Sequence, residues 1–126
     1  MIDIIEDLID WTKEVDGVKT VYLTYPQTKT LAKDKLPMVI IAHAGHRATF
    51  QVHEEIIAEV IYTVEVFADT QTSALSIARA VSDKYADRNG VTNGLSVAYD
   101  NVYRRYSAVF SVTFVVDRRG ALFQTS

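Results

Sequence analysis

Two long alternating stretches decide the fold: IIAEVIYTVEVFA at residues 56–68 and YSAVFSVTFVVD at residues 106–117. Apolar residues take every second position, which predicts two β-strands that each have one buried side. The predicted buried faces are Ala58, Val60, Tyr62, Val64, Val66 and Ala68 in the first, and Tyr106, Ala108, Phe110, Val112, Phe114 and Val116 in the second. At about 3.3 Å per residue, a dozen residues span about 40 Å. Strands of that length indicate a sheet that also contacts a molecule outside the monomer.

The flanking sequence predicts the remaining elements. Ile4, Leu8, Trp11 and Val15 recur at helical spacing, and a second apolar stripe follows a capping residue at Asp69 or Thr70. The predicted helices cover residues 2–15 and 70–85, and the further strands cover 20–25, 37–44 and 95–102. Residues 26–36 carry three lysines and are expected to form an exposed loop. Residues 45–55 are expected to form a turn region, with a short hairpin near His46 and Arg47, and Asn93-Gly94 is expected to form a turn.

The element order predicts a single α+β domain over residues 1–126. In this order, α-β-β-β-α-β-β, the strands form an antiparallel or mixed sheet with both helices packed on one face. We expect Phe110 and its neighbours on that face to contact the helices. The opposite face carries Ile57, Ile61 and Phe67 together with Val109 and Val115. That face is too apolar to be fully solvated, so we expect a partner to cover it.

Composition excludes several classes of function. The 126 residues contain no cysteine, which rules out disulfides, thiol catalysis and zinc–thiolate sites. The formal net charge of −3 argues against a dedicated nucleic-acid binder, because phosphate contacts need clustered lysine and arginine. The N-terminus is acidic and no apolar run is long enough to span a membrane, so we expect no membrane contact. The expected location is the cytosol, or a particle that the protein joins.

Three histidines, His43, His46 and His53, lie within eleven residues and raise the question of a metal site. Their spacing is not that of a helical ligand pair, and positions 43 and 46 of a regular strand point to opposite faces. We therefore interpret them as scattered histidines and expect no metal.

Catalysis is not indicated by any motif in the sequence. It has no nucleophile elbow and no glycine-rich phosphate loop. The carboxylates at Glu54, Glu55, Glu59 and Glu65 are interpreted as solvated or interfacial charges rather than acid–base pairs. We expect no catalytic residue and no cofactor.

Two arginine pairs, Arg104-Arg105 and Arg118-Arg119, flank the second long strand at its two ends. They can contact phosphate as DNA passes, or pair with carboxylates of a neighbouring subunit. They can also be solvated charges that blunt a strand end. Together with Ile57, Ile61 and Phe67, these four arginines are the candidate interaction residues.

Nearly the whole chain resembles the small tail-terminator and tail-completion proteins of long-tailed bacteriophages and prophages, including the lambda-type minor tail protein U and related neck and minor capsid proteins. The resemblance is carried by the opening helix IDIIEDLIDWTKEV, the buried strand LPMVIIAHA, the passage VIYTVEVFADTQTSALSIARAVSDKY and the closing strand YRRYSAVFSVTFVVDRRG. It rests on architecture and pattern rather than on an invariant motif.

The resemblance implies a structural virion protein without an active site. Copies of the chain would form a ring, expected to be a hexamer, that terminates the tail tube and joins it to the head connector. The implied partners are other copies, the tail tube protein and the head-connector protein, with transient contact to passing DNA. The implied location is the tail or neck of the virion, and the host cytoplasm during assembly. The alternatives are a minor capsid or neck protein at another position of the connector, or a small nucleic-acid-binding or ligand-binding α+β module.

Overall fold

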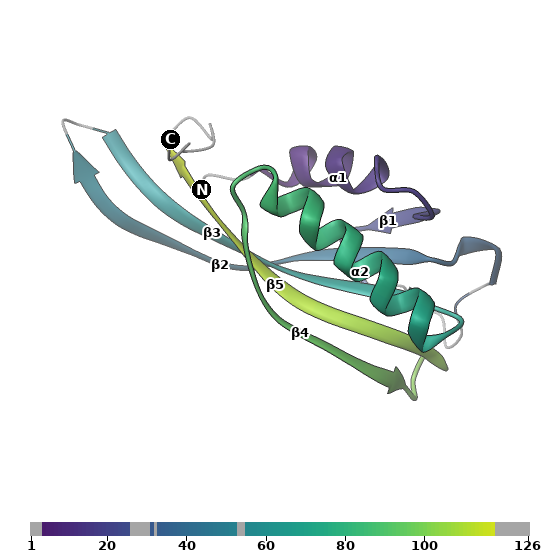
Figure 1. Ribbon diagram of the computed structural model, residues 1–126. Helices are drawn as coiled ribbons and strands as arrows, with labels where there is room; N and C mark the ends of the chain where they lie inside the picture. Colours follow the sequence, from purple (N-terminus) through teal and green to yellow (C-terminus); the bar gives the residue numbers. More distant parts are fainter. Residues whose placement is uncertain (1–3, 26–30, 32, 53–54, 118–126) are drawn as a thin grey trace.

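A computed structural model of the chain describes residues 4–25, 31, 33–52 and 55–117, and describes only the backbone at 46–52, 55–58 and 117. The elements are α1 (Ile5–Lys13), β1 (Thr20–Tyr22), the 3-10 turn η1 (Lys33–Lys35), β2 (Met38–Val52), β3 (Glu55–Ala68), α2 (Gln71–Ala86), β4 (Val91–Asp100) and β5 (Arg105–Asp117). Both helices lie on one face of the sheet (Figure 1). The predicted α+β fold and element order are confirmed.

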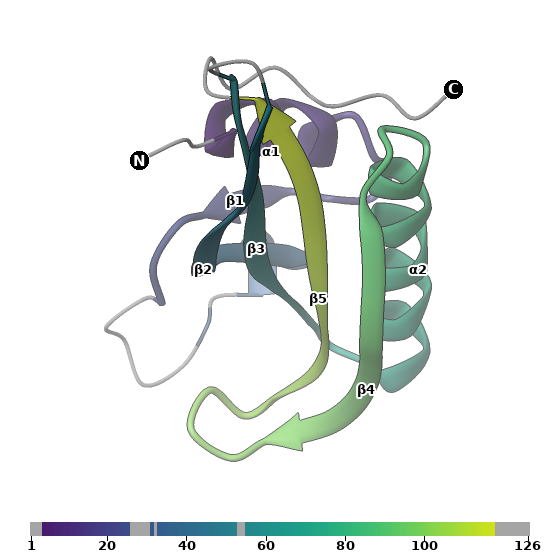
Figure 2. The same ribbon diagram turned by 90° about the vertical axis from the view of Figure 1, so that its left-hand side faces the viewer.

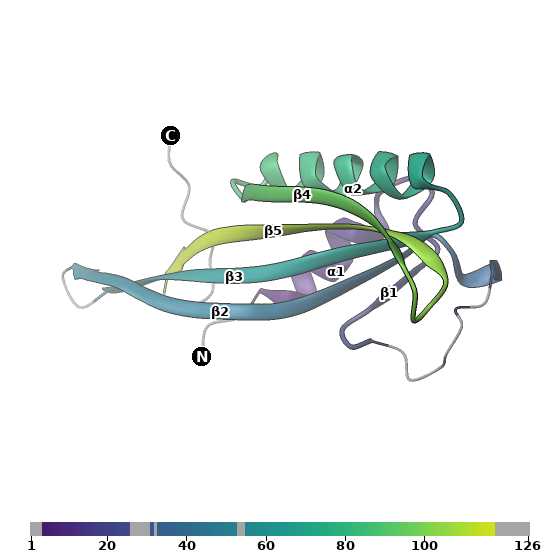
Figure 3. The same cartoon turned by 90° about the horizontal axis from the view of Figure 1, so that it is seen from below.

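The sheet is mixed and its strand order is β1-β2-β3-β5-β4. The short β1 runs parallel to β2, whereas β2, β3, β5 and β4 are joined by antiparallel pairing. Figure 3 shows the sheet from the side opposite the helices, with β2 and β4 as its long outer strands. The two long strands predicted from the alternating sequence are therefore central, and both continue past the helices at one end (Figure 1).

The main core forms where the alternating faces of β3 and β5 meet the helices. Tyr62 pairs with Val112 and Val64 pairs with Phe110, and all four side chains are buried. The rings of Trp11 in α1 and Phe114 in β5 lie 5.9 Å apart between centroids. Burying an apolar side chain of this size contributes about 1.5–3 kcal/mol. For the side chains that the structure describes, the predicted assignment of β3 and β5 residues to the two faces is confirmed.

Specific polar contacts cap α2 and join the two helices to each other. The Thr70 hydroxyl accepts the amide hydrogen bond of Ser73 at 3.1 Å, which makes Thr70 the N-cap of α2. The Thr12 hydroxyl donates to the carbonyl of Leu8 at 2.6 Å and accepts from the buried Tyr85 hydroxyl, which ties α1 to α2. Figure 2 shows α2 running alongside β4. The two helices are thus joined to each other on the sheet face that they share.

The predicted turn region at residues 45–55 is wrong, because β2 continues as a strand to Val52. The register against β3 shifts twice, between His43 and Gly45 and between Ala48 and Phe50. Each shift inserts one unpaired residue into β2, as in a β-bulge, and interrupts the period-two pattern. The β2 sequence therefore lacks the regular alternation of apolar and polar residues from which strands are predicted.

Two smaller expectations are also corrected. The pair Asn93-Gly94 does not form a turn: β4 runs from Val91 through both residues, and the register shifts between Asn93 and Ser96. Gly94 has φ +76° there, a conformation that glycine adopts without steric cost. The strand predicted at residues 20–25 ends at Tyr22.

Candidate functional site

The sheet face opposite the helices, here called the open face, is the first candidate surface. It is half-exposed over its middle, where small or β-branched side chains lie together with Glu59 of β3. The described residues of this region are Ala42, Ile61, Thr63, Val109, Ser111, Thr113 and Val115, and Ser96 and Ala98 continue it on β4. A half-exposed sheet face with one carboxylate among small and β-branched side chains is well suited to contact another protein.

One end of the open face is covered by the chain itself. Met38, Ile40 and Phe67 project from the sheet into a second core that also contains Leu31, Leu36 and Tyr103. Phe67 has 0% exposure, and its ring meets Tyr103 edge to face at 5.3 Å. The expected exposure of Phe67 is therefore wrong, because residues far away in the sequence fold over it.

The segment before this second core is anchored by a tyrosine. The Tyr25 hydroxyl donates to Oε1 of Glu65 at 2.6 Å, and Glu65 itself is 9% exposed. Partial burial and the Glu65 carboxylate raise the pKa of Tyr25. Glu65 is thus not a solvated charge: its carboxylate accepts a hydrogen bond from a residue 40 positions away.

Ile61 and Ile57, two further predicted contact residues, lie on β3. The Ile61 side chain is half-buried and packs across Gly45 of β2, where an added Cβ would lie 3.7 Å from its Cδ1. Ile57 pairs with Phe50 and Asp117 near the far end of the sheet, and its side chain lies outside the described residues. Ile61 is therefore on the open face as predicted.

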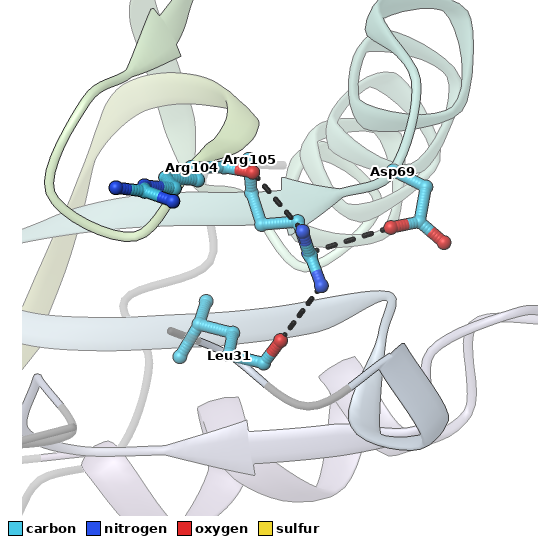
Figure 4. Close-up of polar contacts among 4 residues, drawn as sticks. All are labelled: Leu31, Asp69, Arg104 and Arg105. Carbon is cyan, nitrogen blue, oxygen red and sulfur yellow. Dashed lines mark hydrogen bonds and ion pairs between the residues drawn. The ribbon is translucent and has the colours of Figure 1, made fainter. Parts of the chain in front are cut away.

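The structure separates the two arginines of the first pair (Figure 4). Arg105 is partly buried: its Nη2 donates to the carbonyl of Leu31 at 2.8 Å, and its Nε lies 3.4 Å from Oδ1 of Asp69. That Nε is buried and has no hydrogen-bond partner among the described residues, so its contact with Asp69 is purely electrostatic. Arg105 thus holds the loop at Leu31 and the start of α2 together within one chain.

Arg104 has the opposite character. Its side chain is exposed and points away from the contacts that Arg105 makes (Figure 4). Its backbone has φ +57°, in the left-handed region that costs non-glycine residues energy. Of this pair, Arg104 is the residue available to a partner. Arg118 and Arg119 lie outside the described residues.

The edges of the sheet form the second candidate surface. β4 ends the sheet on one side, and its exposed large apolar side chains are Val91 (69%), Leu95 (39%) and Tyr99 (49%). On the other side, β1 pairs with β2 only at Met38, Val39 and Ile40. In the described part of the chain, β2 therefore has no outer strand partner beyond Ile40.

The sequence analysis did not identify the exposed edge of β4 as a candidate contact surface. A signal was available, because VTNGLSVAYD holds one charged residue, Asp100, whereas exposed edge strands are usually protected by charge. It also missed Leu31 and Leu36, the large apolar residues of a lysine-rich loop. Both are buried, at 2% and 5% exposure.

The histidines are placed differently from expectation. His43 and His46 pair with Tyr62 and Val60, which share one face of β3, because the intervening bulge shifts the register. The argument that they lie on opposite faces is therefore wrong. The His43 ring packs edge to face on Tyr62 at 5.5 Å. No cluster of potential metal ligands occurs among the described residues, and His53 is not one of them.

A hollow of about 290 Å³ lies against the first turn of α1. Ile4, Ile5, Glu6 and Asp7 line it. Acidic side chains are stabilised at a helix N-terminus by the helix dipole, which accounts for these two carboxylates. The hollow gives no indication of a catalytic site.

Comparison with known proteins identifies no family for this chain. No protein-family model matches it, and a search of curated proteins finds no significant match. Among the described residues, no helix is long and apolar enough to cross a membrane. The open face and the two sheet edges are therefore the basis on which a function can be inferred.

Proposed function

We propose that this protein is a structural virion protein of a long-tailed phage or prophage. Copies of it form a ring at the head–tail junction, which terminates the tail tube and joins it to the head connector. In this proposal the protein has no enzymatic activity and holds no cofactor. Its partners are other copies of itself, the tail tube protein and the head connector.

The observation that carries the proposal is the length of three strands, which extend the sheet beyond the helices that cover one of its faces. β2, β3 and β5 contain 15, 14 and 13 residues and run beyond the helices. Strands of 13–15 residues are more than twice the common length of about 5–6 residues. A self-contained domain gains little from such an extension, whereas an assembling subunit gains contact area.

The surface chemistry supports assembly rather than catalysis. The open face offers Ile61, Val109 and Val115 among hydroxyl side chains, and the edge strand β4 exposes Val91 and Tyr99. Exposed apolar residues concentrated on one edge commonly mark contacts between proteins. Arg104 adds an exposed cation at the β4–β5 turn, where it can meet a carboxylate of a neighbour or a phosphate of passing DNA.

The decisive experiment is deletion of the gene from the phage or prophage, with complementation by the wild-type chain. Free heads and unjoined tails in micrographs are the expected result. Normal infectious particles from the deletion strain would overturn the proposal. Immunogold labelling of intact particles then distinguishes the tail terminator from a minor capsid or neck protein at another position.

A charge-reversal variant tests Arg118 and Arg119, which follow Asp117 in the sequence. Arg118→Glu combined with Arg119→Glu is expected to leave the fold intact and to impair head–tail joining. The matched control is Lys13→Glu, an exposed charge at the end of α1. Equal joining by both variants would remove Arg118 and Arg119 from the contact surface.

A further inference from the structure

The two free edges of the sheet run in opposite directions. β2 is antiparallel to β3, β3 to β5, and β5 to β4, so β4 runs antiparallel to β2 within one chain. If a second copy is placed beside the first in the same orientation, its β2 runs antiparallel to the first copy's β4. Antiparallel pairing is the commoner arrangement of neighbouring strands.

The lengths of the free edges also correspond. β4 offers the ten residues Val91–Asp100, and β2 offers the twelve residues 41–52 beyond its pairing with β1. Among the residues that the structure describes, neither edge has a further strand partner, and unpaired edges of this length are templates for another strand. Both edges belong to one chain and lie on opposite sides of its sheet, so a second copy is the occupant that can satisfy both.

We propose that β4 of each copy pairs with residues 41–52 of β2 in the next copy, so that one antiparallel sheet runs through successive subunits. This inference deepens the proposed ring and rests on it. The contact is heterologous, because two different edges meet. Each added copy leaves one β4 edge and one β2 edge unpaired at the ends of the assembly. Only closure into a ring pairs every β4 edge with a β2 edge.

The register sets a minimum displacement between neighbours. Across the sheet, Ser96, Val97 and Ala98 of β4 lie level with Ile40, Val39 and Met38 of β2. These are the three β2 residues that β1 already occupies. Clearing these residues takes a displacement of at least three residues along the strands, and only an even displacement keeps the open-face side chains of both strands on one face. The neighbour must therefore be displaced by at least four residues, which is about 13 Å at 3.3 Å per residue.

That displacement predicts a tilt of the strands. The sheet repeats every four strands, β2, β3, β5 and β4, which is about 19 Å at the usual spacing of neighbouring strands. A displacement of about 13 Å over about 19 Å inclines the strands by about 35° to the ring axis. Strands in closed β-barrels are tilted by about 35–45° for the same reason. A displaced contact is thus compatible with a closed ring.

Thiol cross-linking tests the pairing directly, because the chain has no cysteine of its own. The test variant is Ala42→Cys with Ala98→Cys, two open-face positions on the two edge strands. The matched control is Ala80→Cys with Ala98→Cys, in which the first thiol is exposed on α2. Both variants are treated with a short bismaleimide, as concentrated protein and in particles, and folding is checked by circular dichroism.

The test variant is expected to form a ladder of linked chains that ends at one closed species. Its yield of linked dimer should exceed that of the control about tenfold or more, because adjacent strands hold the two thiols at a high effective concentration. Adding Leu95→Lys and Tyr99→Lys on β4 should abolish the ladder. Equal linking of test and control variants would overturn the strand pairing.

The outcomes separate this inference from the proposed function. Oligomers in light scattering without specific linking of residues 42 and 98 would overturn the edge pairing and leave the ring intact. No linking and no oligomer, in solution or in particles, would overturn both. A specific ladder together with normal particles from the deletion strain would uphold the pairing and overturn the role at the head–tail junction.

Discussion

Phe67 of β3 and Tyr103 of the β4–β5 turn pack edge to face, with ring centroids 5.3 Å apart. This contact lies on the sheet face opposite the helices, where the sequence predicts an exposed, partner-facing phenylalanine. Leu31 and Leu36 complete its enclosure. The domain therefore has a core on each side of its sheet, and the second core is made by segments distant in sequence.

The first prediction concerns the two cores. Phe67→Ala should lower the free energy of unfolding by about 3–5 kcal/mol, as much as Phe110→Ala, because both changes remove a buried ring. Urea denaturation measures both values. Val91→Ala, at a side chain 69% exposed, is the control and should change stability by no more than about 0.5 kcal/mol. A Phe67→Ala loss as small as the control would contradict the second core.

The second prediction uses two glycines with different constraints. A Cβ at Gly90 would lie 2.8 Å from Cε1 and Cζ of Phe114, so Gly90→Ala should destabilise the fold by about 1–3 kcal/mol through overpacking. A Cβ at Gly94 meets nothing within 4 Å, and only its φ of +76° opposes substitution. Gly94→Ala should cost about 1–2 kcal/mol.

The two sites are distinguished by asparagine, which tolerates positive φ better than alanine. Gly94→Asn should recover part of the stability lost in Gly94→Ala. Gly90→Asn should be at least as unstable as Gly90→Ala. Thermal melts of the four variants provide the comparison, and rescue at Gly90 would show that packing on Phe114 is not the constraint.

The third prediction concerns the neighbouring arginines. Arg105→Ala should cost about 1–3 kcal/mol, because a buried charged donor to the carbonyl of Leu31 is lost. Arg104→Gly should instead raise stability by up to about 1 kcal/mol, since glycine adopts φ +57° without strain. Asp69→Asn is the control: the Asp69 side chain is 40% exposed, so its loss should cost below about 1 kcal/mol.

The fourth prediction is an alkaline loss of stability. Burial, with the Glu65 carboxylate, raises the pKa of Tyr25, and burial raises the pKa of Tyr85, both from the ordinary value of 10.0. When the pKa of a tyrosine is higher in the folded state than in the unfolded state, its neutral form stabilises the fold. This stabilisation is complete below the unfolded-state pKa and is lost as the pH rises through the folded-state pKa. The free energy of unfolding should therefore fall once pH exceeds about 10.

Urea denaturation across the alkaline range measures this loss, and ultraviolet absorbance of tyrosinate follows the ionisation. Tyr25→Phe should show a shallower alkaline decline than the wild-type chain, with one late-titrating tyrosine fewer. Its stability near neutral pH should be lower, because Glu65 loses a hydrogen-bond donor. Identical alkaline declines in the two proteins would indicate that the Tyr25–Glu65 contact does not persist in solution.

The sequence by itself determined the central architecture. Alternation over residues 56–68 and 106–117 assigned Tyr62 and Phe110 to the helix-facing side, because successive side chains of a strand point to opposite faces. Helical spacing and the cap at Thr70 placed α2 to within a residue at each end. These features depend on neighbours in the chain, and local periodicity is sufficient to reveal them.

Only the tertiary structure decided which of the outward-facing residues remain available. Phe67 is buried by Leu31, Leu36 and Tyr103, and Arg105 is bound to Leu31, whereas Arg104 stays exposed. The bulges in β2 also cannot be predicted from the local sequence pattern, because a bulge is defined by how β2 pairs with β3. Burial and register are properties of segments brought together from distant parts of the chain, and no local window of sequence contains both partners.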